Sequence, residues 1–139
     1  MERQKKGNRA DRLLQLRKDF STPKRFVFDI DGVITAPHTS TDYHLAVPNY
    51  PMIQVINQLY AKGHEIILFT ARGYVTGIDW RSITEQQLAE WGVSYHELHF
   101  GKPNADYYVD DRMLDMELLL KLAEQDSASS RENTENKSI

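Results

Sequence analysis

The stretch that decides the fold is Phe26-Val27-Phe28-Asp29-Ile30-Asp31-Gly32. Residues 26–30 form a short segment that is apolar and aromatic except for one carboxylate, which is typical of a buried β-strand. Asp31-Gly32 breaks that strand, because glycine lets the chain turn sharply. The segment therefore predicts a buried strand that delivers Asp29 and Asp31 to one place at its carboxyl end.

Strand and helix signals alternate along the chain after this segment. Apolar runs predict further strands at 65–69, 93–98 and 106–110, and helical spacing of apolar residues predicts helices at 52–62, 80–91 and 113–124. This alternation predicts the α/β class, with right-handed crossovers and a mostly parallel sheet covered by helices. Because ligands of such sheets bind beyond the carboxyl ends of the strands, the residues that follow each strand are the candidates for a site.

Polar residues occupy these strand ends. They are Asp29 and Asp31 after the first strand, Thr70 after the second, Lys102 in the loop that enters the fourth, and Asp110 and Asp111 at the end of the fourth. Carboxylates that converge on one point repel each other without a cation, and oxygen ligands without histidine or cysteine suit Mg²⁺. A single aspartate after a strand is most often a turn residue or a helix cap. These four elements together, in this order on a parallel sheet, favour a metal site that accepts a phosphate.

Four motifs in this order resemble those of the haloacid dehalogenase (HAD) superfamily of phosphohydrolases. The matching segments are 28–34, 68–73, 101–103 and 108–112, and the resemblance covers about residues 25–123. It implies a Rossmann-like three-layer fold with a mostly parallel sheet. The spans 34–52 and 70–102 leave room only for a loop and for one helix with one strand, so a member without a cap domain is expected.

The resemblance implies a role for each motif residue. Asp29 is the expected nucleophile, which forms a phosphoaspartate, and Asp31 the acid that protonates the leaving alcohol and then activates water. Thr70 would contact a phosphoryl oxygen, and Lys102 would balance the charge of the transition state. Substrate binding is assigned to Thr70, Ala71, Arg72 and Lys102, with a structural ion-pair partner as the alternative role of Arg72. The Mg²⁺ ligands are expected from Asp29, Asp31, Asp110 and Asp111.

Two matches of the fourth motif stay open. Either Asp110 is the first metal ligand of that motif, or Asp111 is, in which case Asp115 is the second. The segments 69–80 and 95–103 further resemble a small bacterial group associated with capsule or surface-polysaccharide biosynthesis. This implies a phosphorylated sugar or sugar acid as substrate, a small metabolite rather than nucleic acid. An open site in a small protein implies either a large substrate or a neighbouring subunit that acts as the lid, and of these a homo-oligomer is favoured.

Length, charge and cysteine content limit the remaining possibilities. The chain has 139 residues and a net charge of −3, and it contains no cysteine, which excludes disulfides and thiolate chemistry. No apolar run long enough for a membrane span and no secretory signal are apparent, so a cytoplasmic protein is expected. The expected organisation is a basic extension at 1–24, a catalytic domain at 25–125 and a disordered tail at 126–139.

Two other classes of protein compete with this interpretation. A nucleic-acid 3′-end phosphatase shares an Asp-Asp-Arg motif and an open site, and residues 1–25, with nine basic and three acidic side chains, would support it. A phospho-receiver signalling domain also uses acids, a threonine and a lysine on a parallel sheet. Its paired acids come first along the chain, whereas here the Asp110-Asp111 pair comes last.

Overall fold

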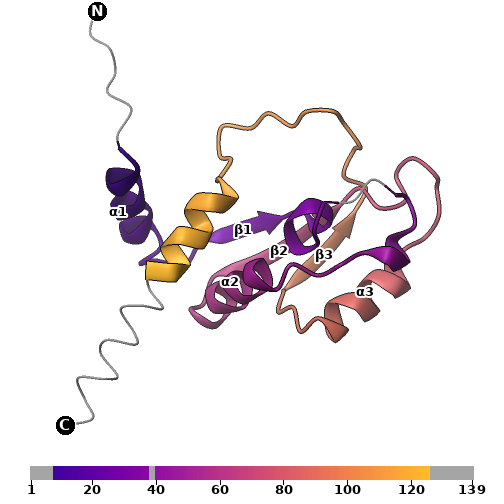
Figure 1. Cartoon of the computed structure of the whole chain (residues 1–139), viewed down its shortest axis with the longest axis horizontal. Helices are drawn as coiled ribbons and strands as arrows, with labels where there is room; N and C mark the ends of the chain where they lie inside the picture. The colour runs from indigo at the N-terminus through magenta and orange to yellow at the C-terminus, as the bar shows by residue number, and fades with distance from the viewer. Residues whose placement is uncertain (1–7, 38–39, 126–139) are drawn as a thin grey trace, which may run out of the picture. The chain divides into compact units, whose positions relative to one another are not determined.

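The computed structural model describes residues 8–37 and 40–125, and Figure 1 traces the chain through them. Contacts divide the chain into two compact units. One combines Met1–Pro23 with Leu114–Ile139, and the other is Lys24–Met113. The predicted tail at 126–139 lies outside the described residues, as do the first seven residues of the predicted extension.

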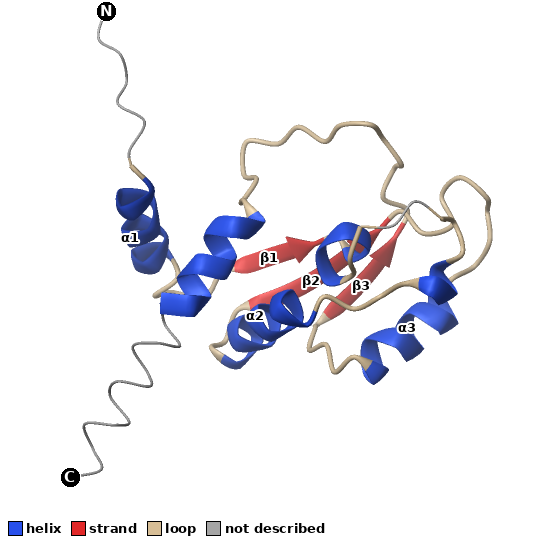
Figure 2. Ribbon diagram, in the orientation of Figure 1, coloured by secondary structure: helices blue, strands red, loops and turns tan. Residues whose placement is uncertain are grey.

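The unit at Lys24–Met113 is built on a parallel sheet of three strands. They are β1 (Arg25–Phe28), β2 (Glu65–Thr70) and β3 (Glu97–Phe100), in the order β1-β2-β3. Phe28 pairs with Leu68, and Thr70 pairs with Phe100. Figure 2 shows the three arrows side by side and pointing the same way, so the strands end at one edge. The predicted α/β class with a parallel sheet is confirmed.

Helix α2 (Tyr50–Ala61) packs on β2 and on the short helical turn η1 (Ile30–Ile34) that follows β1. Asn49 begins α2, since its side-chain oxygen accepts a hydrogen bond from the Met52 amide. The core of this unit is aliphatic and is formed by side chains from its strands and its helical segments. Its fully buried members include Ile30, Ile34, Met52, Ile56, Ile66, Leu68 and Leu88. Burial of these side chains fixes the strand ends on which the candidate site stands.

Two segments complete the unit. Helix α3 (Arg81–Glu90) follows β2, and a short 3₁₀ turn, η2 (Tyr43–Leu45), lies within the span 34–52 that was predicted to hold only a loop. The third strand begins later than the predicted 93–98. The side chain of Asn57 explains the shift, because it donates to the Gly92 carbonyl and accepts from the Ser94 amide, 2.8 Å away in each case. This contact holds residues 92–94 in a loop ahead of β3.

The predicted strand at 106–110 is wrong. Residues 101–115 contain no strand, and Figure 2 draws this stretch as a tan loop. The hydroxyl of Tyr108 donates to the Pro103 carbonyl at 2.5 Å and accepts from the Ala105 amide at 3.2 Å, which closes a local turn. Such side-chain bonds to nearby backbone compete with sheet pairing. Val109 is 97% exposed, so the apolar residues that suggested a strand are not buried.

The other unit joins helix α1 (Arg9–Asp19) to a helix at residues 116–125. Leu13 and Leu16 form a buried cluster with Leu122, and Arg9 pairs with Glu117 at 3.4 Å. The sequence prediction assigned the second of these helices to the catalytic domain, whereas contacts group it with α1. None of the helices in the described part of the chain is long and apolar enough to cross a membrane.

Candidate active site

Three of the predicted site residues stand at the ends of the three strands. Asp29 directly follows β1, Thr70 is the last residue of β2, and Lys102 comes two residues after β3. The Lys102 amide donates to the Thr70 carbonyl at 3.1 Å, which holds the chain leaving β3 beside the end of β2. The Lys102 ammonium then lies 3.0 Å from Oδ2 of Asp29. The parallel topology has therefore brought together residues that are 73 positions apart.

Asp29 is held by the turn that begins at Ile30. Its Oδ1 accepts a hydrogen bond from the Ile30 amide at 2.8 Å, so the carboxylate is the N-cap of η1. Gly32 has a φ of 90°, which lets the chain turn back immediately after Asp31. The side chain of Asp29 is 31% exposed and that of Lys102 is 16% exposed. The carboxylate is thus oriented by two donors while it remains accessible to a ligand.

Arg72 clamps the second carboxylate. Its Nε and Nη2 donate to the two oxygens of Asp31, each at 2.9 Å, in the bidentate arrangement that an arginine fork makes with a carboxylate. Its Nη1 donates to Oγ1 of Thr84 at 3.0 Å and to Oε1 of Gln87 at 2.6 Å. The Arg72 side chain has no exposed surface, whereas that of Asp31 is 23% exposed. Arg72 fixes where Asp31 points, and its predicted contact with substrate stays a prediction.

Tyr43 covers this ion pair. Its ring centroid lies 4.8 Å from the Arg72 guanidinium carbon, and Nε2 of Gln87 donates to its carbonyl at 2.7 Å. Burial raises the pKa of the Tyr43 phenol, and the nearby negative charge of Asp31 raises it further. Tyr43 thus places an aromatic ring against the Arg72 guanidinium that holds Asp31.

Thr70 is held more tightly than the sequence suggested. Its hydroxyl accepts a hydrogen bond from the Arg72 amide at 3.1 Å, and the residue is fully buried. The hydroxyl thus shapes the Thr70–Arg72 turn, which contains Ala71. The predicted contact of Thr70 with a phosphoryl oxygen stays a prediction, as does the binding role of Ala71.

Asp110 and Asp111 lie in the exposed loop that follows β3. Oδ1 of Asp110 accepts from the Arg112 amide at 2.9 Å, and this hydrogen bond, with a second one from Asp111, lowers the pKa of Asp110. Carboxylate oxygens suit Mg²⁺ chemically. Among residues 8–37 and 40–125, however, no three acidic, histidine or cysteine side chains are placed so as to hold a metal ion. The described arrangement assembles Asp29 with Asp31 but does not gather the proposed four-carboxylate set.

Four residues of the site were missed by sequence reasoning. They are Thr35, Tyr43, Thr84 and Gln87. Thr35 is fully buried, and its hydroxyl accepts from the Gly32 amide at 3.2 Å and lies 3.4 Å from Asp31. The hydrogen-bond partners of these four residues lie as much as 44 positions away along the chain. Only Thr84 and Gln87 offered a signal in the sequence. They are three residues apart on a helix and so share a face, and both are polar on the face that is expected to be apolar because it is buried.

The site belongs to an α/β protein that places charged side chains at the carboxyl edge of a parallel sheet. A crystal structure of a structural-genomics target from Vibrio cholerae is similar, with a TM-score of 0.60 and 28% identity over 74% of this chain and 98% of that one. A chain in the structure of a Pnkp1/Rnl/Hen1 complex has a TM-score of 0.48 and 22% identity over 73% of this chain and 33% of that one. No protein-family model matches the sequence. No curated protein matches it either.

Proposed function

We propose that this protein is a phosphomonoester hydrolase of the HAD type without a cap domain, with Asp29 as nucleophile. The observation that carries the proposal is the Asp29–Lys102 pair at 3.0 Å, beside the Thr70 strand end and two residues from the clamped Asp31. A carboxylate oriented by an amide and an ammonium, at the edge where parallel sheets bind ligands, suits attack on a phosphate.

The proposed reaction has two steps. An oxygen of Asp29 bonds to phosphorus while the bond from phosphorus to the alcohol breaks, and Asp31 gives the departing oxygen a proton. Water then attacks the phosphoaspartate and passes a proton back to Asp31, and the phosphate leaves as its bond to Asp29 breaks. Lys102 stabilises the negative charge that builds up on the phosphoryl oxygens.

The individual side chains have distinct tasks in this scheme. The Ile30 amide and Lys102 hold the nucleophile, and the Arg72 fork holds Asp31 in one orientation for its exchange of a proton with the leaving oxygen and the water. Mg²⁺, with Asp29, Asp31, Asp110 and Asp111 as its proposed ligands, would supply charge neutralisation at the phosphate. Since the described residues do not gather this set, no step above depends on it.

The test is release of p-nitrophenol from p-nitrophenyl phosphate. Asp29→Asn keeps the shape of the side chain but removes the nucleophile, and we expect activity to fall by at least about 10³-fold. Asp106→Asn is the matched control, because Asp106 is exposed and lies outside the site. Wild-type rates in Asp29→Asn, or a lack of hydrolysis by the wild-type protein in Mg²⁺, would refute the proposal.

Chelation tests the metal separately. If the proposed cofactor is required, EDTA abolishes the activity and added Mg²⁺ restores it. Full activity in EDTA, still sensitive to Asp29→Asn, would keep the nucleophile and reject the metal.

A further inference from the structure

The side-chain amide of Gln87 joins Arg72 to the segment at 42–46. Its Oε1 accepts a hydrogen bond from Nη1 of Arg72 at 2.6 Å, and its Nε2 donates to the carbonyl of Tyr43 at 2.7 Å. Both ends of the amide are in use, which fixes the places of its oxygen and its nitrogen. Gln87 is 8% exposed, so water competes little for either bond. The amide therefore ties a segment that follows β1 to the arginine that follows β2.

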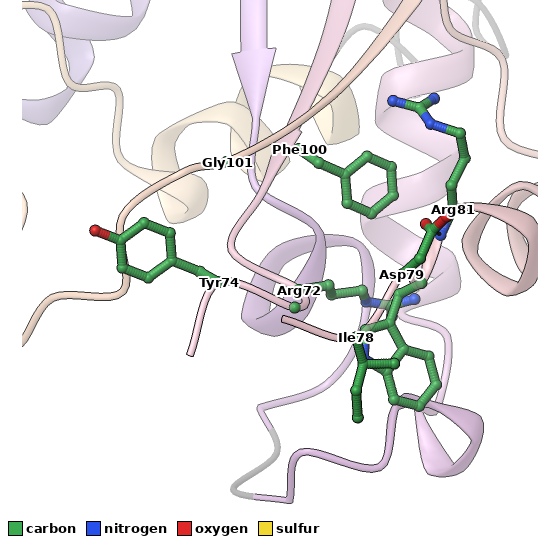
Figure 3. Close-up of a pocket in the computed structure, with 9 residues that line it drawn as sticks. Arg72, Tyr74, Ile78, Asp79, Arg81, Phe100 and Gly101 are labelled. Carbon is green, nitrogen blue, oxygen red and sulfur yellow. Dashed lines mark hydrogen bonds between the residues drawn. The ribbon is translucent and has the colours of Figure 1, made fainter. Parts of the chain in front are cut away.

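The 42–46 segment covers Arg72 with an aromatic ring. The ring centroid of Tyr43 lies 4.8 Å from the guanidinium carbon. Figure 3 shows the Arg72 side chain and Tyr74 pointing in opposite directions, so this cover comes from Tyr43 and not from the neighbouring turn. A ring against a guanidinium face attracts the cation and keeps water from that face. The docked ring thus strengthens the hydrogen bonds that Arg72 makes to Asp31.

The chain that carries the 42–46 segment also contacts Asp31 at its base. There Thr35 and Pro48 pair in an isolated antiparallel bridge. The hydroxyl of Thr35 lies 3.4 Å from Oδ1 of Asp31. The same stretch of chain therefore reaches Asp31 twice, at its base through Thr35 and at the 42–46 segment through Tyr43 and Arg72.

Ring packing alone would leave the position of the 42–46 segment loosely defined. The rings of Tyr43 and His44 meet the Trp80 indole edge to face, at 5.0 and 5.2 Å between centroids. Such contacts are favourable over centroid distances of about 4.5–7 Å, whereas a hydrogen bond needs about 2.7–3.2 Å. The hydrogen bond from Gln87 therefore fixes where the Tyr43 carbonyl lies, and with it the register of the ring over Arg72.

We infer that Gln87 is a positioning residue for the proposed acid Asp31, and that it acts through Arg72 and the docked 42–46 segment. Asp31 is held in one orientation while this segment is docked, and it gains rotational freedom when the segment leaves. The inference rests on the proposed phosphatase function and deepens it. It makes proton transfer by Asp31 depend on a segment that lies outside the four motifs.

Two variants of Gln87 separate this role from simple support of Arg72. Gln87→Glu keeps an oxygen that accepts from Arg72 but replaces the donor to Tyr43 with an oxygen that repels the carbonyl. Gln87→Met removes both bonds. Because both variants break the link to the 42–46 segment, we expect kcat for p-nitrophenyl phosphate to fall by about 3- to 10-fold in each. KM should change by less than about twofold, since Gln87 acts on the acid and not on substrate binding.

Gln86→Glu is the matched control. Gln86 is the neighbouring glutamine on α3, and its side chain is exposed. The same substitution there adds the same charge to the same helix without touching Arg72 or Tyr43. The kcat of Gln86→Glu should therefore equal that of wild type.

Three kinetic results would overturn the inference. Wild-type kcat in Gln87→Glu with a loss in Gln87→Met would show that Gln87 only supports Arg72. A raised KM with unchanged kcat would show that the segment binds substrate instead of positioning Asp31. A wild-type kcat per folded molecule in both variants, with folding followed by circular dichroism, would show a role in stability alone.

Variants of Tyr43 replace this pair if either Gln87 variant fails to fold. Tyr43→Leu removes the ring from the face of Arg72, whereas Tyr43→Phe keeps it. A larger loss of kcat in Tyr43→Leu than in Tyr43→Phe supports the inference. Equal kcat values in these two variants overturn it.

A readout without activity separates the inference from the proposed function. The chain has two tryptophans, so in a Trp91→Phe background the fluorescence comes from Trp80, which is 7% exposed beside the rings of Tyr43 and His44. Acrylamide should quench it more in Gln87→Glu than in Gln86→Glu, because the 42–46 segment is loosened. If no ester is hydrolysed, the phosphatase proposal falls and this quenching decides the docking role of Gln87. Greater quenching supports that role, and equal quenching in the two variants overturns it.

Discussion

Replacing Arg72 with methionine should destabilise the unit at Lys24–Met113 by about 3 kcal/mol. The change removes four hydrogen bonds at once, two to Asp31 and one each to Thr84 and Gln87, from a side chain with no exposed surface. Removing one partner of a buried ion pair costs about 3–5 kcal/mol. We place the loss at the lower end because the Asp31 side chain is 23% exposed and regains some water.

Arg72→Lys separates charge from geometry. Lysine keeps the positive charge but has no planar fork, so it cannot bond to both oxygens of Asp31 and also reach Gln87. We expect the free energy of unfolding of this variant to be lower than that of wild type by about 1–2 kcal/mol, a smaller loss than in Arg72→Met. Because Asp31 would no longer be held in one orientation, kcat for p-nitrophenyl phosphate should fall even in the folded fraction.

Urea unfolding followed by circular dichroism measures both variants, with Arg12→Met as the control on an exposed site in α1. Equal denaturant slopes for wild type and variants would show that the shift in midpoint reports stability. A difference in the free energy of unfolding between Arg72→Met and wild type of less than about 1 kcal/mol corresponds to less than about fivefold in the folding constant. Such a result would refute the view that this network holds the site together.

Further predictions concern pH and backbone geometry. Burial, with repulsion from Lys62 and Lys24, lowers the pKa of His64 below 6.5, and its Nδ1 accepts from the Lys24 amide at 3.0 Å. The unfolded chain therefore binds a proton at His64 more readily than the folded one. The contribution of neutral His64 to the free energy of unfolding is complete above about pH 6.5 and is lost as the pH falls below that value. The urea midpoint should fall over that interval in wild type and less so in His64→Gln; equal pH profiles would contradict this assignment. Gly73→Ala should destabilise the protein by about 1–3 kcal/mol, because Gly73 has a φ of 81° and the new Cβ would collide with the Ile78 carbonyl oxygen. An unchanged midpoint in Gly73→Ala would show that this turn can relax without cost.

The sequence was informative wherever a pattern is local. The apolar runs around Phe28 and Leu68 predicted β1 and β2, and the order of elements predicted a parallel sheet whose ends bring Asp29, Thr70 and Lys102 together. These conclusions needed only strand signals and the rule that parallel strands end at one edge.

Prediction failed where long-range or side-chain contacts decide the outcome. The Asp-Tyr-Tyr-Val-Asp run at 106–110 has the composition of a strand, but strand propensity depends on the surface available for packing, and Tyr108 instead bonds to nearby backbone. The Arg72 network could not be read from spacing, because Thr84 and Gln87 lie 12 and 15 residues away on a helix of mixed polarity.

Thr70 links both halves of the site, since its carbonyl accepts from the Lys102 amide and its hydroxyl accepts from the Arg72 amide. Any change in the length of β2 would therefore displace the clamp on Asp31 and the lysine beside Asp29 together. A one-residue deletion would also bring Phe69 to this position and reverse the faces of the preceding strand residues. Protein engineers who seek to graft a substrate-binding loop here can lengthen the exposed turn at 74–79, but must keep all six residues of β2.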